Sequence, residues 1–405
     1  MKIVHLMWTF GVGGAEEMLA DIANEQCRTE QVWIIILNDE IDDFTRTSVD
    51  PSVKVLCLRR KPGSRSIWPF ARLNWLVRRI GPDIIHAHSC SLVKPLLGRL
   101  PATVLTVHAT REAATFDRSI RRFTRIFAIS KGVADDCMKT KGVPSRIVMN
   151  GIRCGDVRIR PRANDGYFRI VQIARLAHPC KGQDVLLRAI ARIRAQGAGE
   201  RLSLDLIGDG ESRLYLENMV RDLELEDMVT LRGNIPRAQL YEELCDYDLL
   251  VQPSRFEGFG LAVVEAMVAR VPVLVSDLEG PREIIEGGLF GLLFRPEEDA
   301  ECARQIQYIL KTKDSAAMME LKSAAREHAL EKFDIKRTAS RYLEEYREIL
   351  SMKGGTRRGS HLHVPAEQLL RDAGSQPDRV RPSQARKGES AERKRGHRDL
   401  FSQPK

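Results

Sequence analysis

The amino-acid sequence predicts an α/β protein with two domains, each a parallel β-sheet covered by helices. In both halves of the chain, strand-length apolar runs alternate with amphipathic stretches of helix length, which is typical of β-α-β units. A loop rich in Arg, Pro, Asn, Asp and Gly at residues 158–166 interrupts this alternation. The length of 405 residues fits two to three domains, and 43% hydrophobic with 29% charged residues excludes collagen, coiled coils and wholly disordered chains.

The first domain is predicted over residues 1–165. We expect one strand of a parallel sheet at each of its apolar runs, which are residues 3–8, 32–37, 53–58, 84–87, 103–107 and 126–129. None of these runs approaches the ~18 apolar residues that a membrane-spanning helix needs. The beginning of the chain also lacks the basic and apolar regions of a signal peptide, and it is expected to be the first strand.

The second domain is predicted over residues 166–352 as a second Rossmann-like unit. Its expected strands are residues 168–174, 202–207, 229–231, 249–252 and 271–275, with helices at 184–196, 211–223 and 239–245. The pattern then becomes purely helical, at residues 298–311, 315–331 and 335–352. We assign these C-terminal helices to the second domain.

Residues 353–405 form a basic tail of Arg, Lys, Gly, Ser, Gln and Pro with few large apolar residues. Such a composition cannot offset the entropy of ordering, so the tail is predicted to be disordered. Two interpretations stay open: an electrostatic tether to an acidic membrane or nucleic acid, and a dispensable extension.

The net charge of +9 is unevenly divided along the chain. Residues 1–165 carry +9, residues 166–352 carry −7 and the tail carries +7. A basic first domain favours an anionic partner, such as a phospholipid surface, a phosphorylated acceptor or nucleic acid, although solvated surface charge gives the same totals. With eight cysteines that form no CxxC pair, the chain is expected to be a cytoplasmic protein with reduced thiols and a peripheral contact with the inner face of the plasma membrane.

Two short segments carry groups that suit a bound diphosphate. Gly13 and Gly14 follow the first strand and open a helix, so that free backbone amides can face an anion, although a tight turn would need the same glycines. Arg175 and Lys181 lie in the loop after the first strand of the second domain, where open α/β sheets bind their ligands. Two cations there can neutralise a departing diphosphate, or they are ordinary surface charges.

The most specific segment is residues 253–267, in which a strand, a glycine turn and a helix follow one another. The turn permits close backbone approach, and the amides at the start of the helix can hold a phosphate. Glu257 precedes the helix and Glu265 lies within it, so two carboxylates can accept hydrogen bonds from the hydroxyls of a sugar and of a ribose. A helix cap and an unrelated surface glutamate are the alternative.

The ordered series of motifs resembles the retaining glycosyltransferases of the GT-B fold, specifically the large family-four group that builds bacterial glycans. The resemblance covers about residues 1–350. Its motifs are GGAE at 13–16, DIIHAH at 83–88, TVHA at 106–109, ISK at 129–131, NGI at 150–152, the pair Arg175 and Lys181, GDG at 208–210 and EGFGLAVVEAM at 257–267. It implies two Rossmann-like domains that face each other across a cleft. One departure is Arg270, where this family usually has a glycine.

The resemblance also implies roles for individual residues. Glu265 would hold the ribose of the donor nucleotide, Glu257 the hydroxyls of the donor sugar, and His108 would lie beside the transferred sugar. The catalytic set is His108, Arg175, Lys181 and Glu257, and the substrate-binding set is Gly13, Gly14, Arg175, Lys181, Glu257, Phe259, Gly260, Leu261 and Glu265.

The expected reaction is transfer of a hexose-type sugar from a nucleoside diphosphate donor, most often a UDP-sugar in this family, to a glycan or lipid-linked acceptor. It would retain the anomeric configuration, use no metal or other cofactor, and serve bacterial surface polysaccharide or lipopolysaccharide synthesis. Two alternatives are a sugar-nucleotide epimerase of the same architecture and a non-catalytic basic protein that binds nucleic acid. No module for specific nucleic-acid recognition is present in the sequence.

Two patterns that could bind metal are discounted. Asp246 and Asp248 form a D-x-D, but they directly precede a buried strand. His86 and His88 share one face of a strand, yet the sequence offers no third ligand near them. We therefore predict no metal site.

Overall fold

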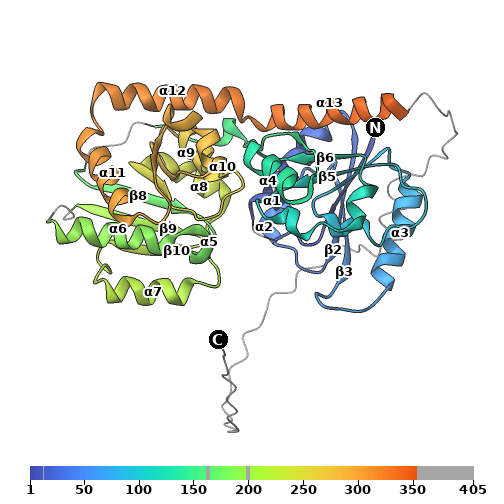
Figure 1. Ribbon diagram of the computed structural model, residues 1–405, viewed down its shortest axis with the longest axis horizontal. Helices are drawn as coiled ribbons and strands as arrows, with labels where there is room; N and C mark the ends of the chain where they lie inside the picture. Colours follow the sequence, from blue (N-terminus) through green and yellow to red (C-terminus); the bar gives the residue numbers. More distant parts are fainter. Residues whose placement is uncertain (12, 161–164, 198–200, 354–405) are drawn as a thin grey trace, which may run out of the picture. The chain divides into compact units, whose positions relative to one another are not determined.

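The computed structural model describes residues 1–11, 13–160, 165–197 and 201–353. The predicted linker at 158–166 falls in part, and the predicted disordered tail almost entirely, outside these residues. Within them the fold contains two parallel sheets (Figure 1).

The first sheet has seven strands in the order β3-β2-β1-β4-β5-β6-β7. Its inner strands are buried on both faces, as expected for a parallel sheet covered by helices. The strands are β1 (Lys2–Met7), β2 (Gln31–Asn38), β3 (Lys54–Arg60), β4 (Ile84–Ala87), β5 (Ala102–Val107), β6 (Arg125–Ala128) and β7 (Arg146–Ile147).

The second sheet has six strands in the order β10-β9-β8-β11-β12-β13. They are β8 (Phe168–Ile173), β9 (Leu202–Ile207), β10 (Val229–Gly233), β11 (Leu249–Gln252), β12 (Val273–Ser276) and β13 (Leu292–Phe294). The prediction of two Rossmann-like α/β units is confirmed. β7 and β13 were not predicted, because two or three residues are too few to show an apolar pattern.

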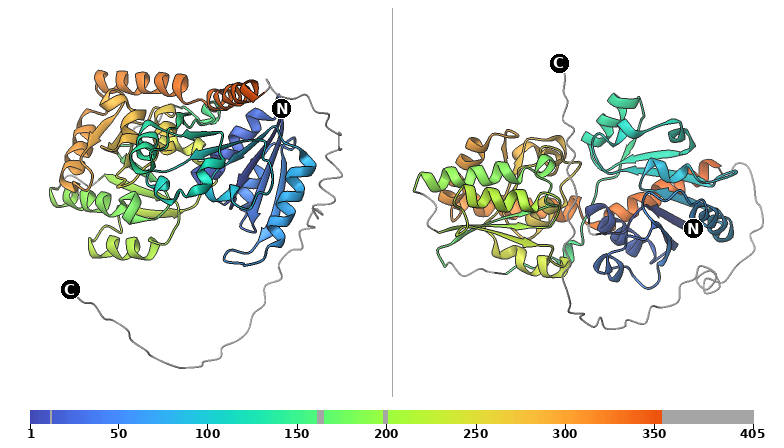
Figure 2. Two further views of the ribbon diagram at one scale, coloured as in Figure 1. Left: turned by 45° about the vertical axis from the view of Figure 1, so that its right-hand side comes forward. Right: turned by 90° about the horizontal axis from the view of Figure 1, so that it is seen from below.

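Helices cover both sheets (Figure 2). Those before β8 are α1 (Gly14–Gln26), α2 (Asp43–Thr47), α3 (Trp68–Ile80) and α4 (Lys131–Lys141). Those after it are α5 (His178–Lys181), α6 (Gln183–Ala195), α7 (Arg213–Asp222), α8 (Arg237–Glu243), α9 (Leu261–Val268), α10 (Glu279–Ile284), α11 (Asp299–Thr312), α12 (Ala316–Lys332) and α13 (Ile335–Lys353). None of the helices in the described ranges is long and apolar enough to span a bilayer.

The last helix corrects the assignment of all C-terminal helices to the second domain. α13 returns to the first sheet, where Tyr342, Tyr346 and Ile349 pack against Ile3 and Val104 (Figures 1 and 2). The amphipathic pattern predicted the helix, but an apolar face does not specify which sheet it will cover.

Ion pairs fix α13 in this position. Glu345, 1% exposed, lies 2.5 Å from Nη1 of Arg125 and 3.1 Å from Nη1 of Arg146. Arg341, one turn earlier on the same helix, pairs with the same carboxylate at 2.9 Å. The first lobe, which we define as strands β1–β7 with their helices and α13, is therefore made of two separate stretches of chain.

Candidate active site

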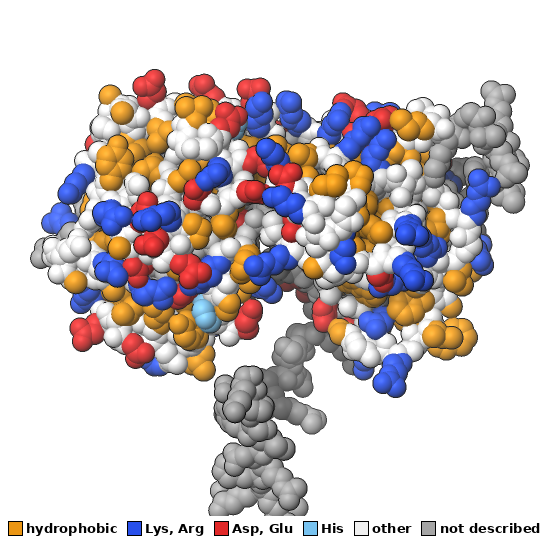
Figure 3. Space-filling model, viewed as in Figure 1, with side chains coloured by type: hydrophobic (Ala, Val, Ile, Leu, Met, Phe, Trp, Pro, Cys, Tyr) orange, Lys and Arg blue, Asp and Glu red, His pale blue; other side chains and the backbone are white. Residues whose placement is uncertain are grey.

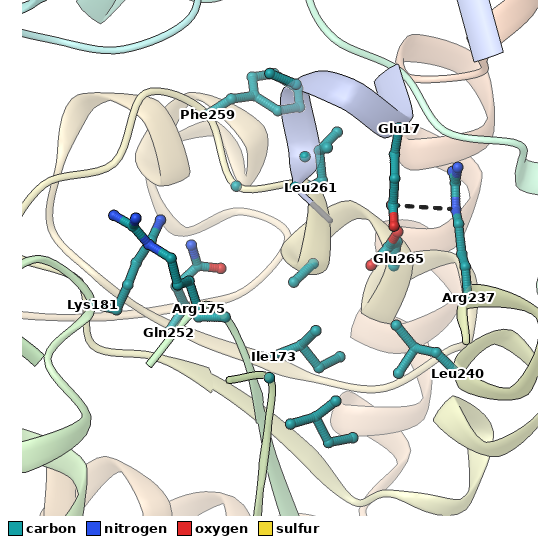
Figure 4. A pocket seen from close by; sticks show the side chains of 18 of the residues that line it. Glu17, Ile173, Arg175, Lys181, Arg237, Leu240, Gln252, Phe259, Leu261 and Glu265 are labelled. Atoms are coloured by element: carbon teal, nitrogen blue, oxygen red, sulfur yellow. Dashed lines mark ion pairs between the residues drawn. The ribbon is translucent and has the colours of Figure 1, made fainter. Parts of the chain in front are cut away.

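A cleft of about 570 Å³ lies at the carboxyl ends of strands of both sheets, where open α/β sheets bind ligands. Its lining comes from both halves of the described chain (Figure 4). The structure brings all the residues predicted for the site into this one lining: Gly13, Gly14, His108, Arg175, Lys181, Glu257, Phe259, Gly260, Leu261 and Glu265.

One end of the cleft carries the two predicted cations. Arg175 follows β8, and Lys181 ends the short helix α5 (Figure 4). Nζ of Lys181 lies 2.8 Å from Oε2 of Glu257, which also accepts hydrogen bonds from Nε2 of Gln252 at 2.5 Å and from Oγ of Ser254 at 3.2 Å. Lys181 is therefore neutralised by Glu257 in the free protein, and an incoming diphosphate would compete for it.

The glycine turn brings the second sheet against the first lobe. A Cβ on Gly258 would lie 2.6 Å from the carbonyl oxygen of His108, so only glycine permits this approach. The Gly258 carbonyl accepts a hydrogen bond from Oγ of Ser130 at 2.7 Å. Gly260, with φ of 117°, precedes α9, and the first residues of that helix, Leu261 and Ala262, line the cleft.

The other end of the cleft holds Glu265, which is 6% exposed and accepts a hydrogen bond from the hydroxyl of Tyr241 at 3.0 Å. Burial raises the pKa of this carboxyl group above its ordinary value. Figure 4 shows Glu265 beside Glu17 and Arg237, at the end of the pocket opposite Arg175 and Lys181. The site therefore has a cationic end and a hydrogen-bonding, carboxylate end.

Sequence reasoning missed an ion-pair cluster at the carboxylate end. Nη1 of Arg237 in α8 lies 2.6 Å from Oδ2 of Asp21 in α1, and its Nε lies 3.9 Å from Oε2 of Glu17. Burial raises the pKa of Glu17 to about 7, with further contributions from the charges of Glu265 and Asp21. Glu17 stood in the predicted start of α1, but Arg237 follows a proline in a segment with no recognisable motif, so nothing in the sequence joined them.

The discounted metal patterns have structural explanations. Asp246 pairs with Arg160, and Oδ2 of Asp248 accepts a hydrogen bond from the amide of Arg169 at 2.8 Å.

The histidine pattern needs a correction, because a third imidazole, His5, lies close to His86 and His88. The sequence could not show this, since the strand order brings β1 beside β4. All six ring nitrogens of these residues already have hydrogen-bond partners within 3.1 Å. The structure thus satisfies these rings as a hydrogen-bonded group.

The fold defines a GT-B protein, with two α/β lobes that together line one cleft. The family model described as "Glycosyltransferase Family 4" matches residues 12–155, and "Glycosyl transferases group 1" matches residues 156–328. The chain belongs to this glycosyltransferase family, as its motifs predicted.

Named relatives are similar over most of the chain. D-inositol 3-phosphate glycosyltransferase of Nocardia farcinica is 27% identical over 72% of this chain and 67% of its own. A 4-α-N-acetylgalactosaminyltransferase of Campylobacter jejuni, whose named acceptor is a diphospho-undecaprenol-linked sugar, is 23% identical over 84% of this chain and 99% of its own. Anabaena Alr3699/HepE, solved in complex with UDP and glucose, superposes with a TM-score of 0.71 at 21% identity over 86% of this chain and 99% of its own.

Proposed function

We propose that the protein is a retaining glycosyltransferase that moves a hexose from a UDP-sugar to a glycan or lipid-linked acceptor during bacterial surface polysaccharide or lipopolysaccharide synthesis. One observation carries the proposal: the buried carboxylate of Glu265 lies at one end of the cleft and the cations Arg175 and Lys181 lie at the other (Figure 4). In a nucleoside diphosphate sugar the hydroxyls of the ribose are likewise followed by the negative charge of the diphosphate. The relatives named above act on sugars, and one of them on a lipid-linked acceptor.

In this proposal the bond between the anomeric carbon and the diphosphate breaks while the acceptor oxygen bonds to the same face. Arg175, Lys181 and the amides of residues 259–261 stabilise the charge on the departing diphosphate, which takes up the proton of the acceptor hydroxyl. The ion pair between Glu257 and Lys181 breaks, and Glu257 then accepts hydrogen bonds from the hydroxyls of the donor sugar. His108 lies beside that sugar. Charge neutralisation by these groups leaves no step that calls for a metal.

A thermal-shift series with UDP, GDP, ADP and CMP tests the donor site. A ligand that binds only the folded state raises the melting temperature, and we expect UDP to do so in the wild type and not in Glu265→Ala. Glu286→Ala, on a surface carboxylate away from the cleft lining, is the control that keeps the shift. If no nucleotide shifts the wild type, the proposed donor site is wrong. The anomeric configuration of the product, read by NMR, tests retention.

The proposal also places the protein at the cytoplasmic face of the membrane through the first lobe. Ile67 and Trp68 at the start of α3 are 73% and 78% exposed. Trp75, two helical turns after Trp68, is 41% exposed. Arg72 and Arg79 occupy the same side of the helix, which joins aromatic side chains to cations as interfacial helices do. Figure 3 shows Lys, Arg and hydrophobic side chains together at the lower right, the end where Figure 1 labels α3.

Vesicle binding tests this attachment. We expect the wild type to sediment with anionic vesicles at low salt and much less with neutral ones, and Trp68→Glu to lose most of that binding. Tyr308→Glu, which changes a 55% exposed aromatic residue on α11, is the matched control. Equal binding to both vesicle types would contradict the membrane proposal and leave the donor-site proposal untouched.

A further inference from the structure

A row of histidines runs from the interior of the first lobe to the cleft. β1 pairs with β4 so that His5 lies opposite His86, and His88 follows β4 two residues further on. β4 in turn pairs with β5, after which His108 follows. Because the strands are parallel and in register, these side chains share one face of the sheet, and His108 alone among them lines the cleft.

Three hydrogen bonds join part of this row into one chain. Oε1 of Gln26, the last residue of α1, lies 2.8 Å from Nε2 of His5. Nδ1 of His5 lies 3.1 Å from Nε2 of His88, and Nδ1 of His88 lies 3.0 Å from Nε2 of His108. Gln26 and His5 are completely buried and His88 is 7% exposed, so water does not compete for these bonds.

Burial keeps the rings of this chain neutral. It lowers the pKa of both His5 and His108 to about 4, and that of His88 well below its ordinary value. A neutral imidazole has one N–H donor and one nitrogen acceptor, so the bond at one nitrogen decides the role of the other.

The amide oxygen of Gln26 gives the chain its direction, because an oxygen can only accept. His5 must then carry its proton on Nε2, which leaves its Nδ1 to accept from Nε2–H of His88. His88 in turn accepts at Nδ1 from Nε2–H of His108. The remaining nitrogen of His108, Nδ1, is left without a proton.

We propose that Gln26, His5 and His88 are positioning residues that hold His108 as its Nε2–H tautomer, so that its Nδ1 accepts a hydrogen bond from a sugar hydroxyl in the cleft. The identification of that hydroxyl as part of a sugar rests on the proposed function. The control of the His108 tautomer by the buried Gln26 is independent of the proposed function.

The direct test is a multiple-bond ¹⁵N–¹H spectrum of the whole protein labelled with ¹⁵N-histidine, which separates protonated from unprotonated ring nitrogens. In the wild type we expect Nε2 of His108 to be protonated and Nδ1 to be unprotonated. Gln26→Met keeps the length of the side chain and removes the acceptor, so the signals of His5, His88 and His108 should move towards mixed tautomers. Gln26→Glu, whose ionised carboxylate can only accept, should restore the wild-type pattern.

Tyr342→Phe is the matched control. It removes a buried hydroxyl that bonds Oγ1 of Thr106 at 3.0 Å in the same layer, but it leaves the chain from Gln26 to His108 intact. The tautomer of His108 should not change in this variant. If Gln26→Met does not fold, His5→Phe interrupts the same chain one step closer to His108. A His108 that is protonated on Nδ1 in the wild type, or unchanged when the chain is cut, overturns the proposal.

Activity provides a separate readout. In Gln26→Met we expect kcat for sugar transfer to fall about tenfold, the loss of one well-placed hydrogen bond, with KM for the donor and the UDP thermal shift unchanged. A rise in KM with unchanged kcat would contradict a role for the tautomer in turnover. If the wild type transfers no sugar, the proposed function fails while the spectra still decide the tautomer.

Discussion

Glu17 is the carboxyl group in the cleft whose pKa lies near neutrality, at about 7. Its folded-state pKa is above the unfolded value of roughly 4.5, so the folded protein retains a proton that the unfolded chain releases between those two pH values. The stability from this group is complete below pH ~4.5 and is lost as the pH rises to about 7.

We therefore expect Glu17→Gln to remove a decline in stability of about 1–2 kcal/mol between pH 4.5 and 7, a figure reduced for the partial exposure of the side chain. Chemical unfolding of both proteins across that range measures it. Glu17→Asp keeps a carboxyl group and should keep the decline. A Glu17→Gln profile that parallels the wild type would show that the group does not titrate there.

Arg270 adopts a backbone conformation that favours glycine. It follows α9 with φ of 62°, in the left-handed region, at the position where the sequence departs from its family. Arg270→Gly should raise the free energy of unfolding by about 0.5–1 kcal/mol, because the side chain no longer opposes this φ. Ala269→Gly, one residue earlier at φ of −74°, should lower it by a similar amount. Urea unfolding compares the two, and equal signs would contradict the explanation.

At the scale of elements, α13 depends on one buried carboxylate. Glu345 is surrounded by Arg125, Arg146 and Arg341, so its removal leaves cations without their partner. We expect Glu345→Ala to destabilise the protein by about 3 kcal/mol, measured by urea unfolding. Its neighbour Glu344, which pairs with Arg341 at the surface and is 60% exposed, should tolerate the same change within about 0.5 kcal/mol. Similar losses in the two variants would show that burial is not the cause.

The helices and strands could be predicted well from the sequence, and the contacts between them less well. The predicted strands at 84–87, 202–207 and 249–252 coincide with β4, β9 and β11, because compact apolar runs bounded by polar residues leave few alternatives. The site motifs also gather as expected, since each follows a strand of a parallel sheet. The contact between Asp21 and Arg237 and the approach of His5 to His88 could not be predicted, because both depend on pairings between segments that no local pattern encodes.

At the scale of the whole molecule, the buried histidines make the fold sensitive to acid. Burial lowers the pKa of His5, His86, His88 and His108 below the ordinary value of 6.5. Below pH 6.5 the unfolded chain therefore binds protons that the folded protein does not bind. The free energy of unfolding falls as the pH drops from 6.5 towards 4.

Each such imidazole contributes a slope of about 1.4 kcal/mol per pH unit. Protons that the folded protein retains on carboxyl groups with a raised pKa oppose this slope; these groups are Glu16, Glu17, Glu112, Glu265 and Glu283. We expect the free energy of unfolding, measured in urea at pH 7, 6 and 5, to fall increasingly steeply. A flat profile down to pH 5 would mean that the rings accept protons in the folded protein, and the neutral chain from Gln26 to His108 would then be excluded as well.

The return of α13 to the first sheet affects how pieces of this protein could be exchanged with those of a relative. The ammonium group of Met1 and the guanidinium of Arg347 both pair with Glu30, so the chain comes back almost to its starting point. A chimaera joined once, near residue 156, would put a foreign helix over Ile3 and Val104, and it would replace Tyr346, whose hydroxyl bonds Nδ1 of His86. Two junctions are needed, and residues 335–353 must be exchanged together with the rest of the first lobe, against which they pack.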